Sequence, residues 1–178
     1  MKKLIFAAMA LVLSTPALAA TYVIPAKVAT DATVCPKVTI VASEPGSTIS
    51  AASLPKTQGN YADINLKTGK AKVGRCVIKI SGFANAVGAP WGATLNGDDN
   101  ANVLTGIADD QNGSASDWIV GNGGDDTISV VASSAAVLGG AGKDSFLVPA
   151  DRKFKLGKKV YTQAIVEDLS AGETLTRR

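Results

Sequence analysis

Acidic side chains are concentrated in residues 96–146, which hold eight aspartates and a single basic residue, Lys143. Asp117, Asp126 and Asp144 in this part are separated by 9 and 18 residues, and the last two end glycine-rich segments. Short carboxylates in glycine-rich turns are suitable ligands for a hard cation such as calcium. The chain has no histidine, which excludes His-containing catalytic triads and His-ligated zinc sites. The sequence therefore predicts cation binding, and we expect that the protein is not an enzyme.

Two segments of this part carry the same pattern of glycine and aspartate. Residues 139–147, GGAGKDSFL, fit G-G-x-G-x-D-x-U-x, in which U is a large apolar residue, and residues 121–129, GNGGDDTIS, fit it with Asn122 in the second place. Asparagine is tolerated there because it also visits left-handed backbone conformations. On these residues the chain resembles the RTX, or haemolysin-type calcium-binding, repeat family over residues 96–147. The resemblance implies a short parallel β-roll that folds and is stabilised on binding Ca²⁺.

The same resemblance implies a set of calcium ligands. Asp126 and Asp144 would supply carboxylates from two stacked turns, and backbone carbonyls would complete the roughly six oxygen ligands that calcium prefers. The residues expected to provide those carbonyls are Gly121, Gly123, Gly139 and Ala141. A weaker second site would pair Asp126 with Asn102 or Asp99. Asp117 is expected to be an unpaired remnant of the repeat.

Large apolar residues recur with the nine-residue period that would position these turns. They are Leu95, Leu104, Ile119, Ile128, Val137 and Phe146, with a six-residue insertion around residues 108–113. Neither a helix nor a simple strand has this period. Each x-U-x triplet predicts a minimal strand that buries U, and two repeats would complete one coil, with turns on one edge about 4.8 Å apart. The turns expected on one edge are 97–102, 121–126 and 139–144, and those on the other edge are 112–117 and 130–135.

The N-terminus predicts export. Residues 1–19 combine two lysines, an apolar run of ten residues and the small-residue site Ala-Leu-Ala, which is the pattern of a secretory signal cleaved before Ala20. The run is too short for a membrane span, which needs about 20 residues. We therefore expect a secreted protein, extracellular, at the cell surface or in the periplasm, that is not membrane-spanning after signal cleavage.

Residues 20–87 predict a small antiparallel β unit, so that the whole chain is expected to be all-β. The runs with strand character are 21–28, 34–42, 61–66 and 70–81, and residues 43–59 are expected to form an irregular loop. Cys35 and Cys76 are expected to form a disulfide within this unit, because the destination is oxidising. The roll at 88–150 and a capping segment at 151–178 would follow.

Three other interpretations stay open. Residues 98–109 place oxygen-bearing residues at EF-hand spacing, although Val103 occupies the position that an EF-hand gives to glycine. Residues 20–95 carry a net charge of +5, which favours a calcium-dependent adhesin or surface-layer component that binds anionic cell-surface polysaccharide. A small secreted hydrolase is the third, although the acids outside the repeats form no recognisable pair. No nucleic-acid partner is expected.

Overall fold

The regular secondary structure in the described part of the chain is almost entirely β, which confirms the predicted all-β class. The computed structural model describes residues 19–30, 38–108, 115–131, 135–150, 152–156, 159–163 and 165–177. Within these ranges the only helix is the short α1 (Ala26–Thr30). No helix in the described part of the chain is both long and apolar enough to cross a membrane. The predicted signal lies outside the described residues except for Ala19.

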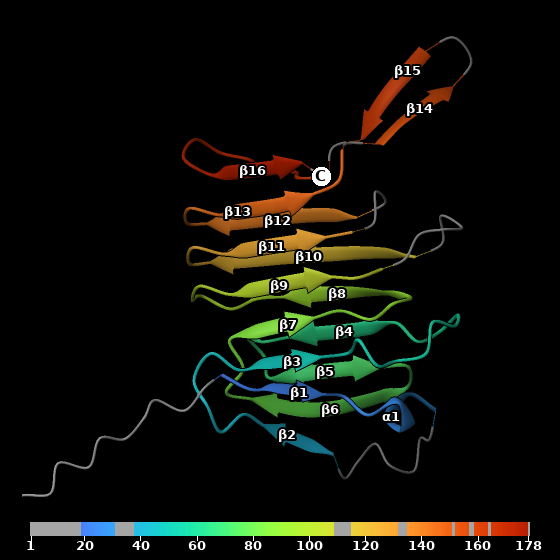
Figure 1. The fold of residues 1–178 in the computed structure, drawn as a ribbon, viewed down its shortest axis with the longest axis vertical. Coiled ribbons are helices and arrows are strands. Elements are labelled where there is room, and N and C mark those ends of the chain that lie inside the picture. The colour runs from blue at the N-terminus through green and yellow to red at the C-terminus, as the bar shows by residue number, and fades with distance from the viewer. Residues whose placement is uncertain are drawn as a thin grey trace, which may run out of the picture.

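Two seven-stranded sheets form the body of the molecule (Figure 1). The first sheet contains, in spatial order, β1 (Thr21–Val23), β3 (Thr48–Ser50), β7 (Asn85–Val87), β9 (Val103–Gly106), β11 (Thr127–Val130), β13 (Ser145–Val148) and β16 (Thr174–Arg177). The second sheet contains β12 (Ala136–Ala141), β10 (Ser116–Gly123), β8 (Gly92–Asn96), β4 (Ala62–Asn65), β5 (Lys70–Val73), β6 (Cys76–Ser81) and β2 (Thr39–Val41). A separate antiparallel pair consists of β14 (Arg152–Leu156) and β15 (Lys159–Gln163).

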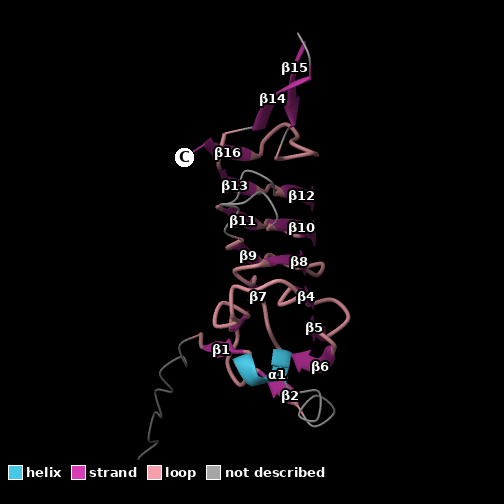
Figure 2. Cartoon of the chain, turned by 90° about the vertical axis from the view of Figure 1, so that its right-hand side faces the viewer, coloured by secondary structure: helices cyan, strands magenta, loops and turns pink. Residues whose placement is uncertain are grey.

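From β8 onward the chain passes back and forth between the two sheets. β8, β10 and β12 lie in the second sheet, and the strands that follow each of them, β9, β11 and β13, lie in the first (Figure 2). Neighbouring strands in this part are parallel. Ile119 is in register with Val137, 18 residues later, and with Leu95, 24 residues earlier. Two nine-residue repeats therefore make one coil, and the coil that contains the predicted insertion is six residues longer.

The core lies between the two sheets, and the nine-residue period identifies its residues. Leu95, Leu104, Ile119, Ile128, Val137 and Phe146 are all buried, none more than 2% exposed. Fully burying a side chain of this size contributes roughly 1.5–3 kcal/mol. Because consecutive apolar residues of the period come from opposite sheets, every coil adds two of them to one continuous core. The packing of this core therefore fixes the position of each turn along the stack of coils.

The N-terminal region differs from the antiparallel unit that the sequence predicts. Only β4, β5 and β6 pair in antiparallel fashion, whereas β1 with β3, β3 with β7 and β2 with β6 are parallel. β7 also pairs with β9, and β4 pairs with β8, so both sheets continue across residue 87. The physical reason is that these short strands find their partners one coil away along the stack, as the later strands do. A hairpin joins β4 to β5, with Gly69 at φ 65° in its turn.

Local departures occur where the sequence has no repeat. The predicted strand at 21–28 ends after Val23 and is followed by α1, and β3 lies inside the segment expected to be a loop. The predicted strand at 70–81 is divided into β5 and β6 by a turn at Gly74, φ 57°. Cys76 is buried on β6 at 2% exposure, and Cys35 lies outside the described residues, so their pairing stays a prediction.

Candidate metal centre

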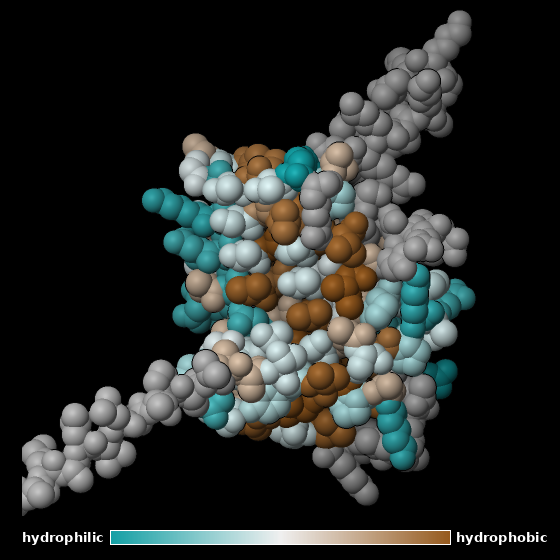
Figure 3. All heavy atoms as spheres, viewed as in Figure 1, coloured by the Kyte–Doolittle hydropathy of each residue, from teal (hydrophilic) through white to brown (hydrophobic). Residues whose placement is uncertain are grey.

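Three turns are stacked along one edge of the molecule. The first turn (97–102) joins β8 to β9, the second turn (121–126) joins β10 to β11, and the third turn (139–144) joins β12 to β13. The N–H of Thr127 donates to the carbonyl of Asn102 (2.9 Å), and that of Ser145 donates to the carbonyl of Asp126 (2.8 Å). The last residues of the turns, Asn102, Asp126 and Asp144, therefore form a column, one from each turn. Hydrophilic side chains gather on this edge, at the left of Figure 3.

Positive backbone dihedrals give the second and third turns their shape. The second and fourth residues of each turn have φ between 78° and 146°: Asn122, Gly124, Gly140 and Gly142. Asn122 is the only non-glycine residue with positive φ in the described part of the chain. Glycine reaches such conformations without steric strain, and asparagine does so more easily than most residues. The glycines of the motif in these places are thus explained by backbone geometry.

Gly121 and Gly139, the first residues of their turns, meet a different requirement. Neither has positive φ. A Cβ on Gly121 would contact Oδ2 of Asp126 and the carbonyl oxygen of Gly139, and a Cβ on Gly139 would contact Oδ2 of Asp144 and, at 2.8 Å, the ring of Phe146. Only glycine leaves room for the inward-pointing carboxylate. Oδ2 of Asp126 and the carbonyl oxygen of the next turn therefore face the same small space beside Gly121.

Asp126 and Asp144 each use one carboxylate oxygen to connect two turns. Both side chains are 1% exposed. Oδ1 of Asp126 accepts the N–H of Asn102 (2.7 Å), and Oδ1 of Asp144 accepts the N–H of Asp126 (2.8 Å). In both residues Oδ2 is buried and has no hydrogen-bond partner. A buried polar atom without a partner costs roughly 1–3 kcal/mol, and more when it is charged. Each Oδ2 therefore needs a partner that the protein itself does not supply.

Burial and neighbouring charges disfavour ionisation of both carboxylates. Desolvation raises the pKa of Asp126 to about 7; the N–H of Asn102 opposes this shift, and the charge of Asp144 adds to it. Desolvation also raises the pKa of Asp144, and the charges of Glu173 and Asp168 act in the same direction. Buried acids in this situation are neutralised either by a proton or by a bound cation.

A cation at this edge would have to be held by side-chain and backbone oxygens together. In the described ranges no group of three or more metal-binding side chains is close enough to hold an ion by itself. The donors would therefore be two carboxylates and backbone carbonyls, which are ligands that calcium accepts. The expected carbonyl donors lie side by side in neighbouring strands, because Gly123 is in register with Ala141 and Asn122 with Gly140.

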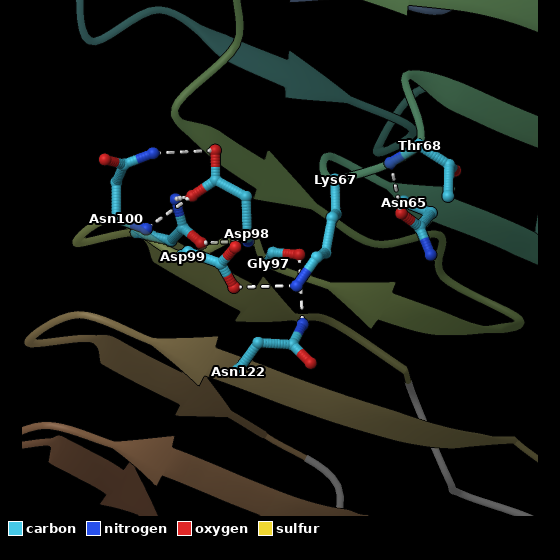
Figure 4. Close-up of polar contacts among 9 residues, drawn as sticks. Asn65, Lys67, Thr68, Gly97, Asp98, Asp99, Asn100 and Asn122 are labelled. Atoms are coloured by element: carbon cyan, nitrogen blue, oxygen red, sulfur yellow. Dashed lines mark hydrogen bonds and ion pairs between the residues drawn. The ribbon is translucent and has the colours of Figure 1, made fainter.

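The second predicted site, around the first turn, is built differently. Asn102 stands in the column, but its amide is engaged by the protein: Oδ1 accepts the N–H of Asp98 (2.8 Å), and Nδ2 donates to the carbonyl of Ala84 (2.9 Å) and to Oδ1 of Asp98 (3.1 Å). Asp99 is exposed and forms an ion pair with Lys67 at 2.7 Å (Figure 4). The structure thus does not bring Asp99 into the column.

Asp117 has a structural role instead of being an unpaired remnant. It is 2% exposed, and both of its carboxylate oxygens accept backbone N–H groups, Oδ1 from Ala93 and Oδ2 from Ala108, each at 2.9 Å. Desolvation raises the pKa of Asp117 to about 6, although the two N–H groups oppose the shift. With no oxygen left unpartnered, Asp117 is not a candidate ligand.

Two acidic residues of the C-terminal segment, Asp168 and Glu173, belong to this edge, although the repeat pattern predicts neither. The carboxylate of Asp168 accepts the first two N–H groups of the third turn, at 2.9 and 2.8 Å. Glu173 precedes Thr174, whose N–H donates to the carbonyl of Asp144 (2.9 Å). The signal that could have found Glu173 is the triplet E-T-L, which matches D-S-F after the third turn, but the β14–β15 hairpin interrupts the nine-residue period.

The EF-hand interpretation of residues 98–109 is wrong. An EF-hand places its loop between two helices, whereas strand β8 precedes this segment and strand β9 lies within it. The last residue of the proposed EF-hand loop, Asp109, lies outside the described residues.

No protein-family model matches the chain, and no curated protein matches it.

Proposed function

We propose that the protein is an exported, non-catalytic calcium-binding protein whose stacked turns form an RTX-like β-roll, stabilised by Ca²⁺ between the second and third turns. The observation that carries this proposal is the pair of buried, unpartnered Oδ2 atoms on Asp126 and Asp144, in adjacent places of one column. A cation near these atoms would give each of them a ligand and would neutralise both carboxylates. The resemblance of both turns to the calcium-binding repeat supports the same assignment.

The donor chemistry favours calcium over other common metal ions. Calcium accepts six to eight oxygen ligands in flexible geometry, including backbone carbonyls, whereas magnesium demands a near-ideal octahedron and usually keeps several waters. Zinc and most transition metals prefer nitrogen or sulfur ligands, and the chain contains no histidine and only two cysteines, Cys35 and Cys76. Cys76 lies on β6, in the N-terminal part of the second sheet.

Binding would act on the protein through thermodynamic linkage. An ion that binds only the folded state stabilises it by RT ln(1 + [Ca²⁺]/Kd), which is about 2.7 kcal/mol at 100 times Kd. Extracellular calcium modules commonly have Kd values of about 10⁻⁴–10⁻³ M. A chain of this kind would be less stable inside the cell, where calcium is scarce, and would reach full stability after export.

A calcium titration monitored by circular dichroism tests this function. The purified protein is compared with Asp126→Asn and Asp144→Asn, and with Asp125→Asn as the matched control. Asp125 lies in the second turn and is exposed, and its Oδ1 accepts the N–H of Lys143 (2.8 Å), which an asparagine can also do. We expect calcium to increase β-structure and melting temperature in the wild type and in the control, and not in the other two. Equal calcium responses in all four proteins would falsify the proposal.

A second candidate function, binding of an anionic polysaccharide, is favoured by the outer face of β5 and β6. Lys70 and Lys79 are directly opposite each other in this antiparallel pair, and both are exposed, as is Lys72 on the same face. Like charges in directly opposite positions destabilise a sheet, and an anionic ligand would relieve this repulsion. The lysines Lys70 and Lys72 border a shallow depression of about 250 Å³.

Retention on a heparin column in a salt gradient tests the second candidate. We expect Lys70→Gln combined with Lys79→Gln to elute at lower salt than the wild type. The control is Lys143→Gln, an exposed lysine in the third turn, away from the face formed by β5 and β6. If the control and the double variant elute together, the lysine face is not a binding surface.

A further inference from the structure

We infer that the C-terminal segment closes the stack with a second cation site, formed between Asp144 and Glu173. This inference rests on the proposed function of the turn edge. It adds a ligand, Glu173, that neither the repeat pattern nor the family resemblance assigns.

The register of β16 places Glu173 in the column. Thr174 is in register with Ser145, and Leu175 with Phe146. The N–H of Thr174 donates to the carbonyl of Asp144 (2.9 Å), which is the same bond that Ser145 makes to the turn below it. Glu173 therefore occupies the position next to Asp144 in the column, as Asp144 occupies the position next to Asp126. Residues 168–173 form a terminal turn of the same six-residue length as the second and third turns.

The Glu173 carboxylate, like those of the two aspartates before it in the column, has one buried oxygen without a hydrogen-bond partner. Oε2 accepts the N–H of Ser170 (2.7 Å), and Oε1 is buried without a hydrogen-bond partner. Among the described residues, three buried side-chain atoms lack a partner: Oδ2 of Asp126, Oδ2 of Asp144 and Oε1 of Glu173. All three come from consecutive places of one column. Unsatisfied buried groups in native proteins require an explanation, and an ion is one of the few available.

Asp144 has an oxygen available for this second site. Its Oδ1 is committed to the N–H of Asp126, on the side of the second turn. Its Oδ2 lies beside Gly139, in the place where Oδ2 of Asp126 lies beside Gly121 and faces the carbonyl of the next turn. Because the third turn lies between the second turn and the terminal turn, Oδ2 of Asp144 can be shared by an ion on each side of the third turn. The side chain is 1% exposed.

Asp168 holds the terminal turn in place before any ion binds. Its two carboxylate oxygens accept the N–H groups of Gly139 and Gly140, at 2.9 and 2.8 Å. The terminal turn, D-L-S-A-G-E, has no glycine in its first four places, and its one glycine, Gly172 with φ 98°, stands in the fifth. Glu173 is half-buried. Water would therefore complete the ligand shell, and the second site is expected to have the larger Kd.

Isothermal titration with CaCl₂ on the full chain, together with melting temperature, tests the inference. We expect two ions in the wild type, one in Glu173→Gln and one in Asp126→Asn, and none when the two substitutions are combined. The matched control is Glu167→Gln, which removes the same charge from an exposed residue of the same segment. We expect the control to bind two ions. Circular dichroism without calcium establishes that each variant has the fold of the wild type.

The possible outcomes separate this inference from the proposed function. If Glu173→Gln binds as many ions as the wild type with unchanged affinity, or if Asp126→Asn binds none, the second site does not exist, and calcium binding between the second and third turns stands. If Asp126→Asn binds as the wild type does while Glu173→Gln loses an ion, the terminal site stands and the proposed function fails. If the wild type binds no calcium, both fail. Should Glu173→Gln misfold, Asp126→Asn alone decides whether a second ion is bound.

Discussion

Asp117 and Asp126 lie at opposite edges of the stack. Their surroundings are similar except for one hydrogen bond. Each is buried, Asp117 at the start of β10 and Asp126 just before β11. The Oδ1 of each accepts an N–H from the coil before it, that of Ala93 or of Asn102. They differ at Oδ2. The Oδ2 of Asp117 accepts the N–H of Ala108, whereas that of Asp126 has no partner. Ala108 stands at the start of the six-residue insertion. The insertion therefore supplies Asp117 with a second hydrogen-bond donor, and Asp126, at the other edge, has no such donor.

Under the proposed function, this difference separates a structural carboxylate from an ion-binding one. Burial, spacing and a raised pKa are common to Asp117 and Asp126. Only the number of donors that the protein provides to each carboxylate distinguishes them. A carboxylate with both oxygens satisfied is complete in the folded chain, and one with a single donor is completed by a ligand.

The largest effect is expected at the structural carboxylate. Asp117→Ala leaves the buried N–H groups of Ala93 and Ala108 without an acceptor, at roughly 1–3 kcal/mol each, so we expect a loss of about 2–6 kcal/mol in the free energy of unfolding. The loss should be the same with calcium and with a chelator, measured by urea denaturation. A larger loss in calcium than in chelator would place Asp117 among the ligands and remove the distinction.

The next effect is the loss of calcium stabilisation at the other edge. At calcium 100 times Kd, we expect about 2.7 kcal/mol in the wild type, or roughly 5–11 °C in melting temperature for a protein of this size. Asp144→Asn should lose this increment, because Oδ2 becomes part of a neutral amide, and should melt near the wild type in chelator. Differential scanning calorimetry measures both. An unchanged increment in Asp144→Asn would contradict the role given to this carboxylate.

The space beside Gly121 provides a third test. Gly121→Ala introduces a Cβ against Oδ2 of Asp126 and the carbonyl of Gly139, and overpacking of this kind costs about 1–3 kcal/mol. It should also weaken calcium binding, since it displaces two of the oxygens. Gly123→Ala is the control, because a Cβ there makes only ordinary contacts, the nearest at 3.5 Å from Asp99. Calcium titration of the two variants compares them; similar affinities would show that the space is not part of the site.

The pH dependence of stability should differ with and without calcium. Folded Asp126, whose pKa is raised from 3.8 to about 7, holds a proton that the unfolded chain releases. The calcium-free protein should therefore lose stability as pH rises from about 4 to 7. Calcium displaces this proton, so the apparent calcium affinity should rise by up to about tenfold per pH unit below pH 7. Titrations at several pH values measure this, and a pH-independent affinity would contradict it.

Calcium does not remove the whole pH dependence in this comparison. Asp117, with a pKa of about 6, binds no ion, so its contribution should persist in saturating calcium and end near pH 6. Asp117→Asn should abolish this remaining part, as measured by melting temperature against pH.

The smallest effect is expected at Asp99. Its ion pair with Lys67 is exposed, with side chains 73% and 55% accessible, and pairs of this kind contribute about 0–1 kcal/mol. Asp99→Asn should leave calcium affinity unchanged, because the carboxylate is exposed and paired with Lys67. A marked loss of affinity would restore Asp99 to the ligand set that the sequence predicts.

The sequence predicts well where a fixed period repeats. The six apolar residues at nine-residue spacing are all in the core, and the turns at 97–102, 121–126 and 139–144 are stacked as expected. This works because each coil repeats one local geometry, so the positions of glycine and of large apolar residues are constrained at every turn. The positive φ of Asn122 follows from the same constraint.

Prediction from sequence fails where pairing is distant or the period is broken. β1, β3 and β7 are three residues long and are stabilised by strands of other coils, which no local pattern reveals. Glu173 is separated from the third turn by the β14–β15 hairpin. The hydrogen bond from the N–H of Ala108 to Asp117 depends on the direction in which the chain enters the insertion. The amino-acid composition of the insertion does not encode that direction.

Asn102 shows how a stack of this kind can evolve. It differs from Asp126 by a single side-chain group, an NH₂ in place of an oxygen, and that NH₂ supplies its own contacts to Ala84 and Asp98. Under the proposed function, a change between these two residue types would convert a turn that requires an ion into one that does not, with the coil preserved. The metal content of such a molecule would then be adjustable turn by turn, through substitutions that natural variation readily supplies.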